Sequence, residues 1–171
     1  MRAFREEDLP FLDRLSSDPE ALGTFEWPGF TDVRTHRRRW EEDGYIGATS
    51  GTVAIDVGDD QVAGIALWKS EGRGVPRGVT YEIGIALVPE HRGRGLGTTA
   101  QRLLVDYIFD HTTANRVEAL TNGENVAEQR SLEKLGFQRE GVLRSRSFIR
   151  GNYSDVLVYG LLRDEARPPA R

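Results

Sequence analysis

Apolar and polar residues recur along this chain with two different periods, and each period predicts one kind of element. Between residues 96 and 111 the apolar positions lie three or four apart, which predicts a helix with one apolar stripe. That stripe consists of Leu96, Ala100, Leu103, Leu104, Tyr107, Ile108 and His111. Residues 80–88 alternate instead from one position to the next, which predicts a strand.

The predicted strand at 80–88 has two unlike faces. The face expected in the core carries Tyr81, Ile83, Ile85 and Leu87. The other face carries Glu82, Gly84 and Ala86. A carboxylate followed by two very small side chains leaves an open trough along the strand.

Patterns of the same two kinds divide the rest of the chain. They predict helices at residues 6–15, 31–43, 96–111 and 125–135, and strands at 52–57, 61–69, 80–88, 116–121, 138–149 and 153–162. In the second helix, Val33 and Trp40 are expected to point inward. A strand–loop–helix–strand unit in the middle of the chain indicates an α/β fold with a mixed sheet. We expect a single domain over residues 1–162 and a disordered tail at 163–171, which has little to bury.

Composition excludes several classes of function. The chain of 171 residues has no cysteine, so a disulfide scaffold, a thiolate metal site and a cysteine nucleophile are all ruled out. No spacing of its three histidines suggests a metal cluster, and we expect no metal. The net charge of −4 argues against a nucleic acid partner. Its apolar runs are far shorter than the roughly 20 residues that span a bilayer, so no membrane segment and a cytoplasmic location are expected.

The loop between residues 88 and 97 carries the most informative chemistry. It follows the strand at Pro89, has glycines at 93, 95 and 97, and runs directly into the predicted helix. Glycines let backbone amides approach an anion closely, and a helix N-terminus adds about half a positive charge. Arg92 and Arg94 add full charges, so the loop predicts a phosphate cradle. The spacing fits neither a dinucleotide-binding fingerprint nor a Walker loop.

These motifs resemble those of the GNAT superfamily of N-acetyltransferases. Arg92-Gly93-Arg94-Gly95-Leu96-Gly97 is similar to the family's R/Q-x-x-G-x-G/A loop, whose amides hold the pyrophosphate of coenzyme A. The segment 125–137, from Asn125 through Leu-Glu-Lys-Leu-Gly-Phe, resembles the RimJ/RimL-like branch, as does the Glu140-Gly141 pair. The resemblance covers residues 2–162 and implies a GNAT-like, mostly antiparallel sheet, helices on both faces and a splayed central strand pair.

The resemblance also implies a set of residues that bind acetyl-CoA. The expected residues are Leu87, Val88, Arg92, Gly93, Arg94, Gly95, Leu96, Gly97, Thr98 and Asn125. Asn125 has a second predicted role, because Glu128 three residues later makes the pair a capping box for the helix that follows.

Glu82 is the candidate general base. A carboxylate can take the proton that an ammonium group must lose before its nitrogen attacks a thioester. The alternative is a strand glutamate held in a salt bridge. No general acid is assigned, because Leu132 occupies the place where many relatives have a tyrosine, and Glu128 the place where others have a serine.

The acceptor remains open at this point, within the class of primary amines. A protein N-terminus and a small amine, such as an amino sugar, a polyamine or an antibiotic, are both candidates. Phe25, Trp27, Phe30 and Tyr45 flank the region where the family binds acceptors, and either line that pocket or fill the core. The alternative to an enzyme is a non-catalytic acyl-CoA-binding module. The oligomeric state is open, and by the resemblance alone two chains would pair as a homodimer through the last strands.

Overall fold

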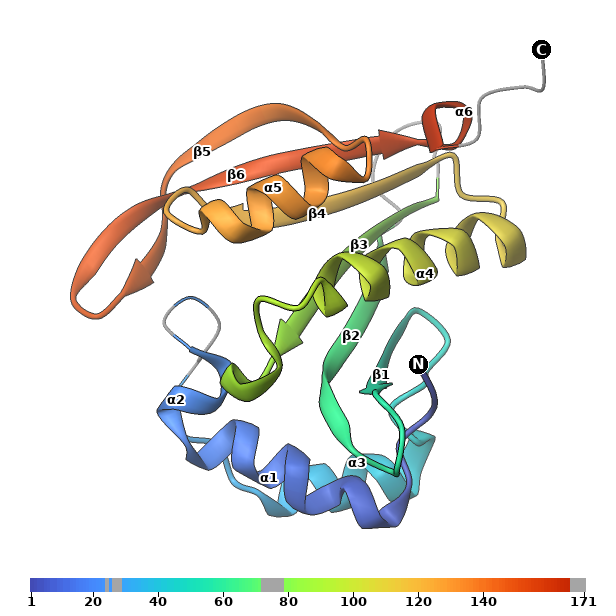
Figure 1. Ribbon diagram of the computed structural model, residues 1–171, viewed down its shortest axis with the longest axis vertical. Coiled ribbons are helices and arrows are strands. Elements are labelled where there is room, and N and C mark those ends of the chain that lie inside the picture. The colour runs from blue at the N-terminus through green and yellow to red at the C-terminus, as the bar shows by residue number, and fades with distance from the viewer. Residues whose placement is uncertain (24, 26–28, 72–78, 167–171) are drawn as a thin grey trace. The chain divides into compact units, whose positions relative to one another are not determined.

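The structure is a computed structural model that describes residues 1–23, 25, 29–71 and 79–166 (Figure 1). Its elements are η1 (Glu6–Asp8), α1 (Leu9–Ser17), α2 (Pro19–Leu22), α3 (Arg34–Asp43), β1 (Ser50–Asp56), β2 (Val62–Glu71), β3 (Thr80–Leu87), η2 (Pro89–His91), α4 (Leu96–His111), β4 (Arg116–Asn122), α5 (Val126–Lys134), β5 (Gln138–Ile149), β6 (Asn152–Leu162) and α6 (Arg163–Ala166). The strands form a six-stranded sheet in the order β1-β2-β3-β4-β6-β5. The fold is therefore the predicted mixed α/β class.

The sheet contains a parallel pair next to antiparallel ones. β3 and β4 run parallel and pair from Thr80↔Arg116 to Ile83↔Ala119, although both strands continue further. β4 with β6 and β6 with β5 are antiparallel. The short parallel ladder agrees with the expected splayed pair in a mostly antiparallel sheet.

Helix starts differ from the prediction where side chains interrupt the pattern. The first predicted helix begins as the 3-10 turn η1, and α1 starts only at Leu9 with Pro10 in its first turn. Proline has no amide hydrogen, so this position suits the start of a helix and not its interior. The second predicted helix begins at Arg34, because the Asp32 carboxylate accepts a hydrogen bond from the Arg34 amide at 3.0 Å. The prediction for Val33 is wrong, since this residue precedes the helix and is exposed.

The chain divides into two compact units, each built from two segments. The first comprises Met1–Leu67 and Ile85–Ala100, and the second comprises Trp68–Gly84 and Gln101–Arg171. The expectation of one domain over residues 1–162 stays a prediction.

The first unit has a core in which α1 contributes more buried residues than any other element. Its buried members are Phe4, Leu9, Leu12, Leu15, Ala21, Tyr45, Ala54 and Val88. Trp40 packs against this cluster as predicted, and its indole Nε1 donates to the Phe4 carbonyl at 3.1 Å. Arg2 forms ion pairs with Asp8 at 2.6 Å and with Asp56 at 2.5 Å, which joins the start of the chain to α1 and β1.

In the second unit, helix α5 packs over the strands β4 and β6 (Figure 1). The buried side chains of this unit include Leu104, Val105, Ile108, Phe109, Val117, Ala119, Leu132, Phe137, Leu157, Tyr159 and Leu161. The Tyr159 hydroxyl donates to Glu133 at 3.1 Å and so ties β6 to α5.

Arg116 forms ion pairs with two glutamates across the strands of the second unit. The Arg116 guanidinium on β4 bonds Glu118 at 2.7 Å and also holds the Glu140 carboxylate on β5. It passes over Gly160 on β6, where an added Cβ would lie 2.5 Å from Arg116. Glu140, quoted above only for its resemblance to a family, therefore has a structural role in this chain.

The described fold continues past the predicted boundary at Leu162. Residues Arg163–Ala166 form the helical turn α6. The Arg163 guanidinium donates hydrogen bonds to the carbonyls of Phe109, Thr112 and Ala114, at 2.5–2.9 Å. The predicted tail is therefore ordered over these four residues, and its remainder lies outside the described part of the chain.

Candidate functional site

The glycine loop leaves β3 with two residues in a left-handed conformation. Gly93 has φ = 72° and Gly95 has φ = 76°. A Cβ added at either position would meet no heavy atom within 4 Å, so space lies open above both. Side chains rarely adopt this backbone conformation, and glycine adopts it without strain. Backbone amides here are exposed to an incoming anion.

Helix α4 begins immediately after Gly95. The first hydrogen bond of its backbone ladder runs from the Thr99 amide to the Gly95 carbonyl at 3.0 Å. Amides of the first turn of a helix have no partner within it, and the helix dipole adds a partial positive charge. The two open glycines and this helix start fit a pyrophosphate group.

The two arginines of the loop have different environments. The Arg92 guanidinium donates to the Leu87 carbonyl at 2.8 Å and to the Ala21 carbonyl at 3.2 Å, and it lies over Gly23. It fixes the loop to the end of α2. Arg94 is exposed and forms no ion pair among the described residues. Of the two predicted phosphate-binding side chains, Arg94 is thus the one not already engaged by the protein.

The end of β3 is held closely against β2. A Cβ at Gly64 would lie 2.1 Å from the Ala86 carbonyl oxygen, so only glycine fits at this position. The Val88 amide donates to the Ala63 carbonyl at 3.0 Å. The Leu87 carbonyl accepts from Arg92, and the Val88 carbonyl accepts from the His91 amide. A carbonyl oxygen has two lone pairs, so each of these two carbonyls can accept one further hydrogen bond. The expected backbone contacts with acetyl-CoA can use these remaining lone pairs.

Glu82 belongs to the second unit and has an ion pair. Its Oε2 lies 3.8 Å from Nζ of Lys69, and the Glu82 side chain is 36% exposed. The salt-bridge alternative is thus realised, but the pair is long and half exposed. Solvent-exposed pairs of this kind contribute only about 0–1 kcal/mol, so the pair holds the carboxylate weakly.

Asn125, also in the second unit, caps α5 as predicted. Its side chain accepts a hydrogen bond from the Glu128 amide at 3.2 Å. The Glu128 carboxylate accepts from the amide of Gln101, a residue only 1% exposed. Ser131 donates to the other end of the same side chain at 2.6 Å. This buried Gln101, which periodicity alone did not reveal, fixes α5 to α4 and with it the position of Asn125.

Thr121 has a buried polar atom with no partner. Its hydroxyl is the unpaired buried side-chain atom of the described residues, on β4 beyond the last residue that pairs with β3. Nearly all buried polar groups are hydrogen-bonded, so such an atom indicates a missing partner. Sequence reasoning missed it, because a threonine in a strand is unremarkable by pattern.

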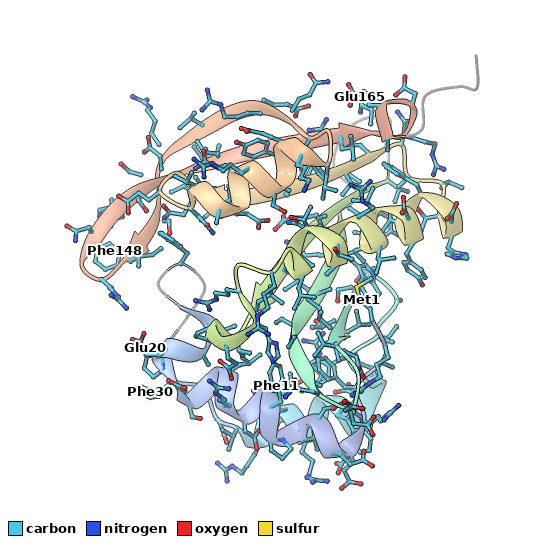
Figure 2. The ribbon with its side chains drawn as sticks, viewed as in Figure 1. Met1, Phe11, Glu20, Phe30, Phe148 and Glu165 are labelled. Carbon is cyan, nitrogen blue, oxygen red and sulfur yellow. The ribbon has the colours of Figure 1, made fainter. Side chains whose placement is uncertain are left out.

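The aromatic residues predicted near the acceptor have different environments where the structure describes them. Tyr45 is buried in the core of the first unit, edge-on to Phe4 at 5.4 Å between ring centroids. Phe30 is 79% exposed (Figure 2). Phe25 is partly buried in a turn. Trp27 lies outside the described residues. For Tyr45 the structure therefore supports the core alternative.

Burial has shifted the pKa of the Tyr45 phenol to about 12. Its hydroxyl contacts Nδ1 of His36 at 2.5 Å, and Nε2 of the same ring contacts the Ser16 hydroxyl at 2.6 Å.

Within the described ranges, no three side chains that could hold a metal gather together. No described helix is long and apolar enough to cross a bilayer.

Comparison with known proteins assigns the family. The model of the acetyltransferase (GNAT) domain matches residues 1–138. An uncharacterized N-acetyltransferase, p20 of Bacillus licheniformis, is 31% identical over 96% of this chain and 93% of its own length. Spermidine N(1)-acetyltransferase of Escherichia coli is 34% identical over 44% of this chain and 41% of its own length.

A solved structure has the same fold. Spermidine N-acetyltransferase from Vibrio cholerae, in complex with CoA and spermine, superposes with a TM-score of 0.83. The match covers 96% of this chain and 95% of the other at 21% identity. Family and fold together favour an enzyme over a non-catalytic binding module. The chain belongs to the GNAT family and is an acetyl-CoA-dependent N-acetyltransferase.

Proposed function

We propose that this chain transfers the acetyl group of acetyl-CoA to a primary amine by direct attack in a ternary complex. The observation that carries the proposal is the open pair of left-handed glycines, Gly93 and Gly95, which leads directly into the N-terminus of α4. A glycine-rich loop that leads into a helix N-terminus is a ready-made site for a phosphate group.

In this proposal the loop holds the cofactor by its backbone. Amides from Arg92 to Thr98 bind the pyrophosphate, and the Arg94 guanidinium adds a screened positive charge. The carbonyls of Leu87 and Val88 and the side chain of Asn125 contact the pantetheine arm. The unpaired Thr121 hydroxyl is a further group available to it. When bound, acetyl-CoA supplies the activated thioester.

Glu82 acts as the general base. It takes the proton of the incoming ammonium, which leaves a lone pair on nitrogen to attack the thioester carbon. A carbon–nitrogen bond forms as the carbon–sulfur bond breaks, and the nitrogen then releases its second proton to water. The departing thiolate takes its proton from water, because Leu132, in the place of a family tyrosine, has no proton to donate.

The acceptor is a protein N-terminus or a small amine. Relatives of both kinds exist: the spermidine enzymes named above, and a putative ribosomal N-acetyltransferase of Bacillus subtilis, YdaF, which is 33% identical over 49% of this chain and 46% of its own length. This last match supports the RimJ/RimL-like branch as part of the proposal.

A free-thiol assay tests the function. The chain is mixed with acetyl-CoA and a panel of amines that includes peptides, amino sugars and polyamines, and released CoA is measured. Release that depends on an amine, with the acetylated amine found by mass spectrometry, is the expected result. Binding of acetyl-CoA without amine-dependent release would contradict the proposal.

A further inference from the structure

Strand β5 has a bulge in which three of its residues lie opposite one residue of β6. Leu143 pairs with Val156 and Ser147 with Ser154, so the three residues between them oppose Asp155 alone. Ser145, in the middle of the bulge, has φ = 53°, and its amide donates to Asp155 Oδ1 at 2.9 Å. Bulges are enriched at sheet edges and beside active sites, where they redirect side chains.

The bulge presents two arginines to solvent. Arg144 and Arg146 are exposed and line one open hollow of about 780 Å³ together with Asp155. Neither guanidinium forms an ion pair or hydrogen bond with any described residue. Arg116 of the same unit differs, because Glu118 and Glu140 bind it fully. The two guanidinium groups and one carboxylate leave the hollow with a net positive charge.

Hydrogen bonds connect the bulge to the turn that carries Asn125. The Asp155 carbonyl accepts from the Gly123 amide at 2.9 Å, and Asn122 Nδ2 donates to the Ser154 hydroxyl at 2.7 Å. The Asn125 amide in turn donates to the Asn122 carbonyl at 2.9 Å. The hollow is thus fixed to the carboxyl end of β4, which includes the unpaired Thr121. Beyond the bulge, close to the turn of the hairpin, the rings of Phe148 and Tyr153 lie with centroids 4.9 Å apart. Figure 2 labels Phe148 there.

We infer that the acceptor is a primary amine that carries an anionic group, a carboxylate or a phosphate, bound by Arg144 and Arg146. The inference rests on the proposed function, which brings the pantetheine arm to Asn125, in the turn after β4 to which the hollow is fixed. The planar fork of a guanidinium matches both anions with paired hydrogen bonds. Polyamines carry only positive charge, and the same hollow repels them.

Initial rates with matched acceptors test the inference. The acceptors are Ser-Glu, Ser-Gln and Ser-Lys peptides with amidated ends, and the small amines phosphoethanolamine, ethanolamine and spermidine, at saturating acetyl-CoA. We expect kcat/KM for the acidic member of each set to exceed that of the neutral member on the order of tenfold. The cationic members should be the poorest acceptors.

The preference should shrink in 0.5 M NaCl, because exposed charges are screened over a few ångströms there. The two sets distinguish a protein N-terminus from a small molecule.

The double variant Arg144→Gln/Arg146→Gln identifies the residues responsible. It should lose the preference for the acidic acceptor, while KM for acetyl-CoA and kcat/KM for the neutral acceptor stay within about twofold. Arg139→Gln, on the same strand outside the bulge, is the matched control and should retain the preference.

The outcomes separate this inference from the function beneath it. Equal rates for the three peptides, a preference for Ser-Lys or spermidine, or an unchanged preference in the double variant would each overturn the inference alone. An equal loss of activity with every acceptor in a folded double variant would show that the arginines do not read charge. If acetyl-CoA binds but no amine is acetylated, the proposed function fails, and the inference fails with it.

Discussion

At the scale of single residues, Glu82 combines an accessible carboxylate with a weak ion pair. In Glu82→Gln the size of the side chain is kept but the ability to accept a proton is lost. We expect turnover to fall by about 10²–10⁴, the usual contribution of a positioned general base, with little change in acetyl-CoA affinity. The loss should shrink at high pH, where the acceptor is already a free amine. Steady-state rates from pH 7 to pH 10 measure both effects.

The ion pair with Lys69 supplies the control for this prediction. Lys69→Met removes the pair and keeps the carboxylate, so turnover should remain near that of the wild type. Because the pair is half exposed, we expect Glu82→Gln to lower the free energy of unfolding by less than about 1 kcal/mol. Unchanged turnover in Glu82→Gln would show that another group or water takes the proton. A large loss of stability would favour a structural role.

Gly95→Val tests the phosphate cradle. The side chain would occupy the open space above Gly95 and adopt φ near 76°, a conformation that costs about 1–3 kcal/mol for a residue other than glycine. We expect a folded protein without measurable acetyl-CoA binding by calorimetry. Gly44→Val is a matched control: Gly44 has φ = 59° and open space, but ends α3 outside the loop. The control should lose similar stability and bind acetyl-CoA normally, whereas normal binding by Gly95→Val would mean that the cradle is misplaced.

At the scale of elements, His36 on α3 bridges Ser16 on α1 and Tyr45. Burial lowers the pKa of His36, opposed by Asp13 and assisted by Arg39. The unfolded chain therefore binds a proton more readily, so the contribution of His36 to stability is present above about pH 6.5 and is lost as the pH falls toward the lowered value. We expect urea denaturation to show a decline in stability from pH 7 to pH 5.

Substitution at His36 should remove that part of the decline. His36→Gln is expected to be less stable at pH 7 but to change less between pH 7 and pH 5 than the wild type. His111→Gln replaces an exposed imidazole at the end of α4 and should keep the wild-type pH dependence. Parallel pH profiles for the wild type and His36→Gln would contradict the assignment.

Strand positions were predictable from sequence, whereas the orientation of α4 was not. Every strand boundary lies within two residues of its prediction, because alternation and turn residues act locally. The bounds of α4 were also correct, but Leu103 and Tyr107 of its predicted stripe are each 48% exposed. The helix buries Gln101 instead, since Glu128 and Ser131 satisfy the amide. A pattern of apolar residues cannot reveal partners thirty positions away.

The features of the candidate site that depend on local backbone conformation were predictable from the sequence. Glycines in a fixed order predicted a loop whose amides can approach an anion, and Gly93 and Gly95 have left-handed φ values that other residues rarely adopt. The capping motif predicted Asn125 as the N-cap of α5. The contacts of Arg92, the close approach at Gly64 and the bulge at Ser145 depend on segments distant in sequence, so only the folded chain reveals them.

At the scale of the whole molecule, acetyl-CoA should stabilise the folded chain. A ligand present at 100 times its dissociation constant adds about 2.7 kcal/mol to the free energy of unfolding. We expect a thermal shift that weakens as salt rises, because salt screens the proposed attraction between the exposed Arg94 and the phosphates. Arg94→Gln should lose much of the salt dependence. Arg92→Gln should instead lower the melting temperature without ligand, since its guanidinium holds the loop to Ala21. The absence of any shift or heat with acetyl-CoA would contradict the cofactor assignment.

Arg163 lies one residue past the last strand, yet its guanidinium caps the C-terminal end of α4. It donates to one carbonyl in the last turn of this helix and to two carbonyls just after it. A helix C-terminus depends on such donors when its own amides have run out. A shortened form for crystallisation or fusion that stops at Leu162 would therefore loosen a helix some fifty residues earlier, and one that stops after Ala166 would not. The safe attachment point for a tag is thus set by α4, an element in the middle of the chain.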